Sequence, residues 1–306
     1  MTIILAIDGN DNNWYDLFAD VETQDGSPIQ IEQTLWKNVS IASYSDRGAY
    51  LRIQKSDQPI PGTSQEENRI IKPDLFVVRS LVRPGPALVD LRNILYGLKF
   101  GNVPCINSLH SLYCCLERPW VFSELLKIQK RLGADKFPII EQIYYSHPRE
   151  MIITPQFPIV VKMGCAHAGF GKMRLQNHND FDDFRTVIAL TQEYVTAEPF
   201  IETDYDIRIQ KIGTHFRAYK RIAMGWKGNQ TTTTIEQIPV TSTYKLWIEE
   251  SSKIFGGLDI CALDVIHATD GREYILELND SAIGLAPQYV EEDMRHIKKL
   301  VMTKID

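Results

Sequence analysis

Residues 260–280, ICALDVIHATDGREYILELND, decide the fold of this chain. Two apolar, β-prone runs flank the dipeptide Asp270-Gly271, which is a strong signal for a two-residue hairpin turn because both residues tolerate the positive φ angles of type I′. Counting outward from that turn places Asp264 directly opposite Glu277 on the neighbouring strand. Two carboxylates in this position repel each other, so some other group is needed to hold them together.

The polar side chains at the end of this hairpin share one face. Side chains two residues apart in a strand point the same way, so Glu277 and Asn279 project together while Leu276 and Leu278 point to the other face. A hard divalent cation, Mg²⁺ or Ca²⁺, binds carboxylate and amide oxygens and would relieve the repulsion. The sequence therefore predicts a metal site formed by Asp264, Glu277 and Asn279. The alternative is that these groups lie on the solvated outer face of an edge hairpin.

The composition indicates a globular, water-soluble protein. The 306 residues are enough for one large domain or for two to three smaller ones, with 44% hydrophobic and 24% charged residues. The net charge is −6 and no long basic run occurs, which argues against nucleic acid as the main partner. The same acidic balance gives no general attraction to an acidic membrane, so only a local basic patch could provide one.

The cysteines and the N-terminal residues indicate a cytoplasmic protein. There are five cysteines, none of them in a CxxC pair, and an odd number of reduced thiols fits the cytosol. The opening TIILAID, residues 2–8, has no basic start and predicts a strand rather than a signal peptide. No apolar run approaches the ~20 residues that a membrane span needs. His110, His167 and His215 are not spaced as a metal cluster and are interpreted as structural or incidental.

The first third of the chain alternates predicted strands and helices. Strands are expected at 3–7, 73–80 and 103–107, with weaker ones near 28–32 and 50–54, and a helix ends at Gly101 after the periodic stretch GPALVDLRNILYGLKF. This alternation predicts a parallel, Rossmann-like sheet. The loop after the first strand reads DGND and lacks the GxGxxG fingerprint, so dinucleotide binding is not supported there.

The remaining two thirds are richer in strands. Helices are expected at 119–133, 180–192 and 243–257, a strand at 137–145, and further strands in PIVVKM, KMRL, YVTAEPFI, DIRIQKI, HFRAYKRI, CALDVI and EYILEL. Breaks between these elements divide the chain into three expected domains, residues 1–112, 113–197 and 198–306.

Three glycines, Gly164, Gly169 and Gly171, lie between two predicted strands in PIVVKMGCAHAGFGKMRL, residues 158–175. A P-loop or a Rossmann motif leads into a helix, so this strand–loop–strand arrangement is neither. A glycine-rich hairpin can still cover a polyphosphate with its backbone N–H groups, and Lys162 and Lys172 at its ends would supply positive counter-charge. The alternative is a mobile hairpin with ordinary surface lysines. A metal site in the same chain favours a nucleoside triphosphate as the ligand, because binding one requires both a loop over the phosphates and a cation.

The segment AEPFI, residues 197–201, predicts an extended connection between two lobes because Pro199 interrupts regular structure. Such a hinge can present backbone N–H and C=O groups to the edge of an adenine ring, with Glu198 nearby. The alternative is an ordinary strand end with a buried Phe200.

These features occur in the order of the ATP-grasp fold: a glycine-rich hairpin, a hinge, and a larger lobe that ends in an acidic metal strand. The segments NSLHSLY, RPWVF, VVKMGCAHAGFGK, YDIRIQKIG and HATDGREYILEL closely resemble the central C domain of the synapsins, the ATP-binding phosphoproteins of synaptic vesicles. The resemblance runs from about Pro73 to the C-terminus and is weaker across 21–68. The phosphorylated head and proline-rich tail of synapsins are not in the sequence, so we expect an isolated C domain, either a fragment or a short family member.

The resemblance implies an α/β protein of α+β lobes, with the ATP-grasp fold and an N-terminal Rossmann-like pre-ATP-grasp domain. It implies ATP and Mg²⁺ or Ca²⁺ as ligands, bound between two lobes. It also implies a homo-oligomer, a dimer or tetramer, that contacts the vesicle membrane surface and the cytoskeleton. Such a protein is cytoplasmic and held peripherally on synaptic vesicles.

Matched position by position, the resemblance assigns the ligand contacts. They are Lys162, Lys172, Gly169 and Gly171 for the phosphates, Arg118 where the family has a lysine, Glu198, Phe200 and Ile201 for adenine, Lys227 on a loop that closes over the nucleotide, and Asp264 and Glu277 for the metal. One position departs from the family, because ELNDSA stands where synapsins read approximately EVVGSS. Asn279 thereby restores a ligand that working ATP-grasp ligases use, which favours Mg²⁺ and leaves catalysis open.

Two functions compete on this evidence. The first is a synapsin-type domain that binds ATP, assembles and tethers vesicles, with ATP favouring a closed state in which loop 225–234 is ordered; simple surface disorder of that loop is the alternative. The second is an ATP-dependent carboxylate–amine ligase, ranked lower because no second-substrate signature is present. A third possibility, a scaffold with a degenerate site, conflicts with the intact lysines and carboxylates.

Two arginines would serve the ligase. Arg208 and Arg221 lie on predicted strands of the large lobe, where they could clamp a substrate carboxylate bidentately. The favoured alternative is that they pair with Asp204, Asp206 or Glu202.

Overall fold

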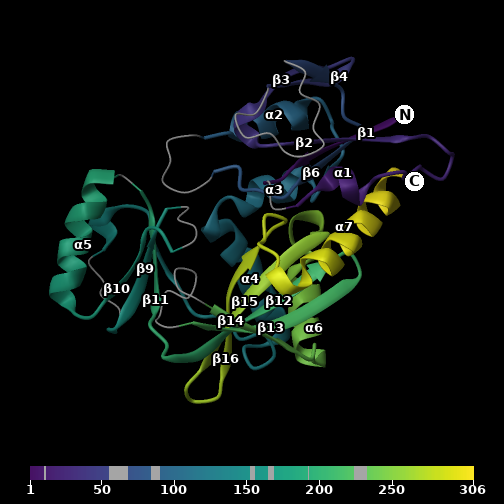
Figure 1. Cartoon of the computed structure of the whole chain (residues 1–306). Helices are drawn as coiled ribbons and strands as arrows, with labels where there is room; N and C mark the ends of the chain where they lie inside the picture. The colour runs from purple at the N-terminus through teal and green to yellow at the C-terminus, as the bar shows by residue number, and fades with distance from the viewer. Residues whose placement is uncertain are drawn as a thin grey trace.

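The computed structural model of the chain describes residues 1–9, 12–54, 68–83, 90–151, 156–164, 169–191, 193–223 and 233–306. Within these residues the strands form four sheets, one parallel and three antiparallel. The N-terminal part lies at the top of Figure 1, the lobe that carries α5 (His178–Thr191) at the left, and the largest sheet below them. The mixed α/β architecture predicted from the sequence is confirmed.

The N-terminal sheet is parallel, as the alternation of strands and helices predicted. Its order is β2 (Ile29–Thr34), β1 (Thr2–Ile7), β6 (Leu75–Val78) and β7 (Cys105–Ile106). All four residues of β6 are buried, as is usual for a central parallel strand whose two faces are both covered. Two helices flank the sheet: α1 (Trp14–Leu17), capped by the Asn13 side chain, and α2 (Arg92–Phe100), which ends at Gly101 as predicted.

A small antiparallel sheet packs against α2. It contains β3 (Val39–Tyr44), β4 (Gly48–Ile53) and β5 (Arg69–Ile71). The approach is close because Gly97 and Gly101 have no side chain: a Cβ at Gly97 would lie 2.8 Å from Ile41 Cγ2, and one at Gly101 would lie 2.6 Å from Ala49 Cβ. The sequence analysis missed β3, whose apolar residues are interrupted by small and polar ones, whereas β4 lies where a weak strand was expected.

The central sheet has the order β10 (Lys172–Leu175), β9 (Ile159–Met163), β11 (Val195–Pro199) and β8 (Ile143–Tyr145), with antiparallel pairing throughout. Helix α5 covers it with Phe181, Phe184 and Ile188. The glycine-rich segment does connect two strands, as predicted. Only the last three residues of the strand predicted at 137–145 form one, β8, so the prediction is wrong over most of its length. Residues 137–140 instead lie beside β16, where Ile275 N donates a hydrogen bond to Pro138 O and Ile140 N donates one to Ile275 O.

The C-terminal sheet is the largest, with the order β14 (Thr233–Ile238), β13 (His215–Ala223), β12 (Thr203–Ile212), β15 (Ile260–Ala268) and β16 (Glu273–Asn279). Helices α4 (Arg118–Leu132) and α6 (Ser242–Ser251) pack on one face, against Cys261, Leu263 and Val265 of β15. The opposite face carries α7 (Val290–Ile305), which packs on Ile260 and Ala262.

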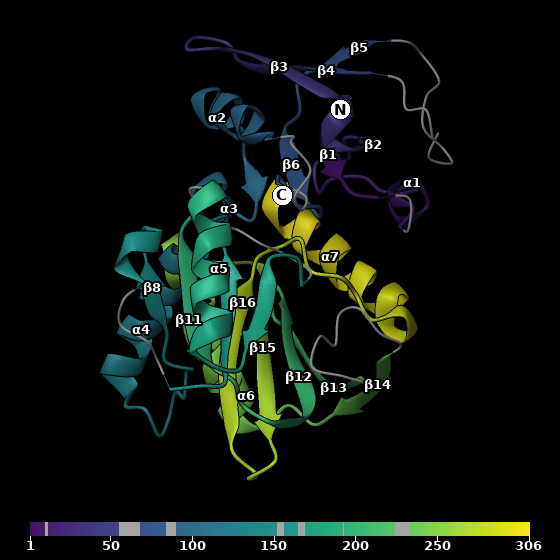
Figure 2. The ribbon, with the colours of Figure 1, turned by 90° about the vertical axis from the view of Figure 1, so that its left-hand side faces the viewer.

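Helix α7 joins the two ends of the molecule. Its apolar residues share one core cluster with Ile4 and Ala6 of β1 and with Ile212 of β12, and the two views show it running between the N-terminal and C-terminal sheets (Figures 1 and 2). The sequence analysis missed α7 and α3 (Leu109–Cys115). The acidic first turn of α7 and its apolar spacing were usable signals, whereas α3 (LHSLYCC) contains mostly weak helix formers.

Four short 3₁₀ turns complete the described elements, at Trp36–Asn38, Pro148–Glu150, Ile254–Gly256 and Pro287–Tyr289. The helix predicted at 243–257 therefore ends earlier, and its last residues form the third of these turns. None of the helices in the described ranges is both long and apolar enough to cross a membrane.

Candidate functional site

The β15–β16 hairpin pairs Asp264 with Glu277, as predicted, although the predicted turn is one residue too short. The loop has three residues, closed by Ala268 N donating to Arg272 O at 2.8 Å, with Gly271 at a φ of 82°. A β-bulge between Asp264 and Val265 then shifts the register by one residue, so the two differences cancel.

The bulge also changes where the leucines lie. Val265 pairs with Ile275 and Asp264 with Glu277, which leaves Leu276 as the extra residue. Leu278 belongs to the core cluster below the sheet, as expected, but Leu276 does not. Leu276 lines a cavity beside Glu277, and so does Leu278.

Asp264 is buried at 3% exposure, and polar groups surround its carboxylate. Arg208 approaches as a fork, with Nε 2.8 Å from Oδ1 and Nη2 2.9 Å from Oδ2. Arg221 Nη2 donates to Oδ1 at 2.9 Å, and Asn279 Nδ2 donates to Oδ2 at 3.1 Å. Burial alone would raise the pKa of Asp264, but Arg208 and Arg221 outweigh it and hold the pKa below its usual value.

These contacts correct the prediction for the two arginines. Neither forms its main ion pair with Asp204, Asp206 or Glu202, although Arg221 Nη2 lies 3.9 Å from Asp206 Oδ2. Both arginines instead bind a carboxylate that the sequence assigned to the metal.

Glu277 is held from another side. Arg118, at the start of α4, donates through Nη1 to Glu277 Oε2. Burial opposes ionisation of this carboxyl, yet Arg118 and Lys162 hold its pKa well below the usual range. Both predicted acidic metal ligands are therefore ionised, adjacent, and neutralised by guanidinium groups.

Two lysines lie on the neighbouring sheet. Lys162 and Lys172 are direct cross-strand partners, so their side chains share a face of the central sheet. Lys162 is 5% exposed, and its Nζ lies 2.7 Å from Glu198 Oε1. Burial lowers the pKa of Lys172, and the positive charge of Lys162 lowers it further. This pair of cations would gain from an anionic ligand.

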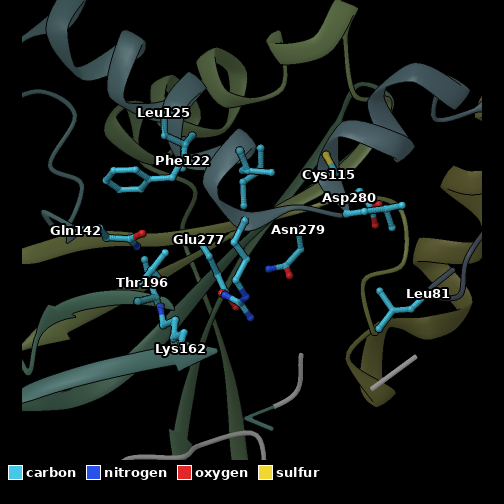
Figure 3. Close-up of a pocket in the computed structure, with 15 residues that line it drawn as sticks. Leu81, Cys115, Phe122, Leu125, Gln142, Lys162, Thr196, Glu277, Asn279 and Asp280 are labelled. Carbon is cyan, nitrogen blue, oxygen red and sulfur yellow. The ribbon is translucent and has the colours of Figure 1, made fainter. Parts of the chain in front are cut away.

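A cavity lies between these groups (Figure 3). Helix α4 forms an apolar wall with Phe122 and Leu125, while Lys162 and Thr196 project from the central sheet and Glu277 and Asn279 from β16. The full lining is Leu81, Cys115, Leu116, Arg118, Val121, Phe122, Leu125, Gln142, Lys162, Thr196, Leu276, Glu277, Leu278, Asn279 and Asp280. A pocket that combines apolar side chains with a few charged ones is suited to a ligand with a flat ring and a charged group.

The predicted hinge residues lie elsewhere. Glu198 is buried and accepts from Gln142 Nε2 at 2.9 Å as well as pairing with Lys162, so its carboxylate supports the lysine. Phe200 and Ile201 are partly buried and do not line the cavity. The Phe200 ring carries the guanidinium of Arg174, 3.6 Å from the ring centroid.

The predicted phosphate loop is described in part. Gly169 and Gly171 have φ angles of 81° and 63°, which glycine adopts at little cost, just before β10. Residues 165–168 and Lys227 lie outside the described residues, as does most of the predicted closing loop 225–234.

Several lining residues were missed by sequence reasoning. Leu276 was not assigned to the site, because the bulge beside it was not predicted. Gln142, Thr196, Phe122 and Leu125 carry no local signal, because only the tertiary fold brings α4 and the central sheet to the same cavity.

Two family models match the chain. Residues 1–105 match the synapsin pre-ATP-grasp domain, and residues 107–306 match the synapsin ATP binding domain. Among curated proteins, synapsin of Drosophila melanogaster is 37% identical over 304 residues. The match covers 97% of this chain and 29% of that protein, so the chain spans less than a third of its relative's length.

Solved structures show the same fold at low sequence identity. The ATP-grasp ligase PsnB, complexed with a minimal precursor, has a TM-score of 0.64 at 14% identity and covers 100% of this chain and 99% of its own. The D-cycloserine synthetase DcsG has a TM-score of 0.66 at 12% identity, with 100% of both chains covered. The predicted ATP-grasp fold is therefore confirmed.

Proposed function

This chain belongs to the synapsin family, and we propose that it binds ATP together with a divalent cation in the cavity between the central and C-terminal sheets. The single observation that carries this proposal is the lining of that cavity. It places the buried Lys162 on one wall, Glu277 and Asn279 on the other, and the apolar surface of α4 beside them.

The residues fit the two ends of ATP. The apolar side chains of Phe122, Leu125 and Leu276 would take the adenine ring, since they form the least polar part of the lining. Lys162, Lys172 and Arg118 would take the triphosphate as counter-charges. This arrangement moves the adenine contact away from the hinge residues Phe200 and Ile201 and onto α4 and β16.

The residues also fit a hard cation. Glu277 and Asn279 would hold it directly, with Asp264 beside them, because carboxylate and amide oxygens are the donors that Mg²⁺ and Ca²⁺ prefer. The cation would neutralise the negative charge of the triphosphate. Arg118 would then exchange Glu277 for a phosphate oxygen, which keeps its guanidinium paired in both states.

The three lobes would divide this task. Residues 1–112 would form the pre-ATP-grasp domain, residues 113–197 would supply the phosphate hairpin, and residues 198–306 would supply the cation ligands. By relation to synapsin, such a domain would self-associate and act at synaptic vesicles, on the membrane surface or the cytoskeleton. The Drosophila relative supports these larger roles only as proposals, because this chain spans a small share of it.

A titration tests ATP binding. ATP is added to the whole chain in an isothermal calorimeter with Mg²⁺, with Ca²⁺, or with EDTA. We expect binding with a cation and a large loss with EDTA. Glu277→Lys should abolish the cation dependence, whereas Glu236→Lys on the exposed edge of the sheet should behave as wild type. Equal ATP affinity in EDTA, or an unchanged Glu277→Lys variant, would contradict the proposal.

A ligase is the second candidate, favoured by Asn279 beside Glu277. Against it, Arg208 and Arg221 both form ion pairs with Asp264, so neither guanidinium is available to bind a substrate carboxylate. Release of ADP and phosphate is measured with a panel of carboxylic acids and amines. Turnover that depends on one acid–amine pair would establish a ligase; ATP binding without turnover supports the first candidate. Sizing with and without ATP tests self-association separately.

A further inference from the structure

Two histidines from distant parts of the chain meet at the start of α7. His215 begins β13, while Glu292 and His296 lie one turn apart on α7 and therefore share a helix face. One ligand atom from each of the three residues lies within 4.8 Å of the others. The sequence analysis interpreted His215 as structural or incidental, because it is not spaced as a metal cluster with His110 and His167. It did not consider His296, since α7 was not predicted.

One ring nitrogen of the cluster has no hydrogen-bond partner among the described residues. His215 Nε2 is buried, and no group in the described part of the chain forms a hydrogen bond with it. A buried nitrogen without a partner costs free energy unless another ligand satisfies it. Its ring stacks on that of His296, with centroids 3.8 Å apart and an interplanar angle of 8°.

The carboxylate is oriented by a neighbour. Arg217 Nη2 binds Glu292 Oε2 at 2.9 Å, and the other oxygen, Oε1, lies 3.8 Å from His296 Nε2. Arg217 is itself fixed by the buried Asp293 at 2.9 Å. Arg217 therefore holds one oxygen of Glu292 and leaves the other oxygen near His296. In metal sites, neighbouring residues orient the metal ligands in the same way.

The imidazoles are suited to coordination. Coordination uses the lone pair of a ring nitrogen, and Nε2 of His215 is buried without a hydrogen bond from the described part of the chain. The side chains of His296 and Glu292 are 33% and 48% exposed, so both can rotate to close the set.

We propose that His215, Glu292 and His296 form a binding site for a divalent transition cation of the zinc class. Two imidazole nitrogens and one carboxylate oxygen are a donor set that Zn²⁺ accepts, with a fourth position open to water. Mg²⁺ and Ca²⁺ prefer sets made of oxygen, so this site differs in chemistry from the proposed nucleotide site. None of its residues lines the cavity.

The cation would tie α7 to the C-terminal sheet. Helix α7 packs in one core cluster with β1 and β12, so it holds the N-terminal and C-terminal sheets together. A cross-link between its first turns and β13 would stabilise that junction. A cation that binds the folded chain but not the unfolded chain raises the free energy of unfolding by mass action.

Zn²⁺ binding to the tag-free, EDTA-treated whole chain tests the proposal. We expect one Zn²⁺ per chain by calorimetry, raised thermal stability, and a Co²⁺ visible spectrum of low coordination number. His215→Ala and His296→Gln should each lower the Zn²⁺ affinity by at least about tenfold, since even outer-shell changes cost that much. His178→Ala on α5, an exposed histidine, should leave it unchanged, and excess Mg²⁺ should not compete.

His296→Gln replaces a partly exposed side chain with one of similar length, so it separates loss of a ligand from loss of the fold. Circular dichroism verifies the helix content. Wild-type Zn²⁺ affinity in both variants, or no Zn²⁺ bound to the wild type, would overturn the proposal. Because the assay contains no nucleotide, its outcome is independent of ATP binding.

Discussion

Asp264 lies directly opposite Glu277 across the β15–β16 hairpin, and each carboxylate is neutralised by arginines from a different part of the fold. Arg208 and Arg221 on β12 and β13 hold Asp264, while Arg118 on α4 holds Glu277. The repulsion that the sequence assigned to a metal ion is therefore already relieved by the chain. A cation has to compete with guanidinium groups for these oxygens, and that competition decides when it binds.

The first prediction concerns cation binding without nucleotide. Mg²⁺ or Ca²⁺ alone should bind weakly, because it would have to displace Arg118 from Glu277 without offering that guanidinium a new anion. With a triphosphate present, Arg118 gains phosphate oxygens and the competition is removed. Calorimetric titration of each cation with and without a non-hydrolysable ATP analogue measures the difference. Equal cation affinity in the two titrations would show that the arginines do not control the site.

The second prediction concerns the buried charge cluster. Arg208→Ala should destabilise the fold by about 3 kcal/mol, because it removes a bidentate partner from a buried carboxylate. Arg272→Ala breaks an exposed ion pair with Asp270, in which Nε and Nη2 both reach Oδ2, and it should cost much less than Arg208→Ala. Guanidinium denaturation of the two variants compares them. Equal costs would mean that the Asp264 cluster adds no more than a surface pair.

The third prediction follows from the lowered pKa of Glu277. A carboxyl whose pKa is depressed in the folded state stabilises the fold above its unfolded pKa, about 4.3, and loses that contribution as the pH falls through the folded value. Glu277→Gln should therefore cost about 2 kcal/mol at pH 7 and progressively less below pH 4. Denaturation curves from pH 7 to pH 3 measure this. A cost that does not change with pH would show that the charge of Glu277 is not what stabilises the fold.

The fourth prediction concerns the lysine pair. Because burial and Lys162 lower the pKa of Lys172, its ammonium is lost at a lower pH than that of an ordinary lysine, and ATP affinity should fall as the pH rises through that range. An arginine stays charged throughout, so Lys172→Arg should flatten the profile. ATP titrations from pH 7 to pH 10 give both curves. Parallel curves would exclude Lys172 as the titrating group.

Much of the fold could be predicted from local pattern, and the site only in part. The Asp270-Gly271 signal located the hairpin and paired Asp264 with Glu277, but local sequence did not reveal the three-residue loop or the compensating bulge at Leu276. Arg208 and Arg221 had nearer acidic neighbours in sequence, and only the sheet register places them beside Asp264. The cavity wall from α4 depends on helix-to-sheet packing, which periodicity does not encode.

The most direct test of the central claim is a crystal structure with a non-hydrolysable ATP analogue and Mn²⁺, located by its anomalous scattering. We predict a Mn²⁺ peak in contact with Glu277 and Asn279, the triphosphate between Lys162 and Lys172, and Arg118 turned from Glu277 to a phosphate oxygen. A nucleotide bound outside the cavity, or an ordered nucleotide with Glu277 still paired to Arg118 and no metal beside it, would contradict the account.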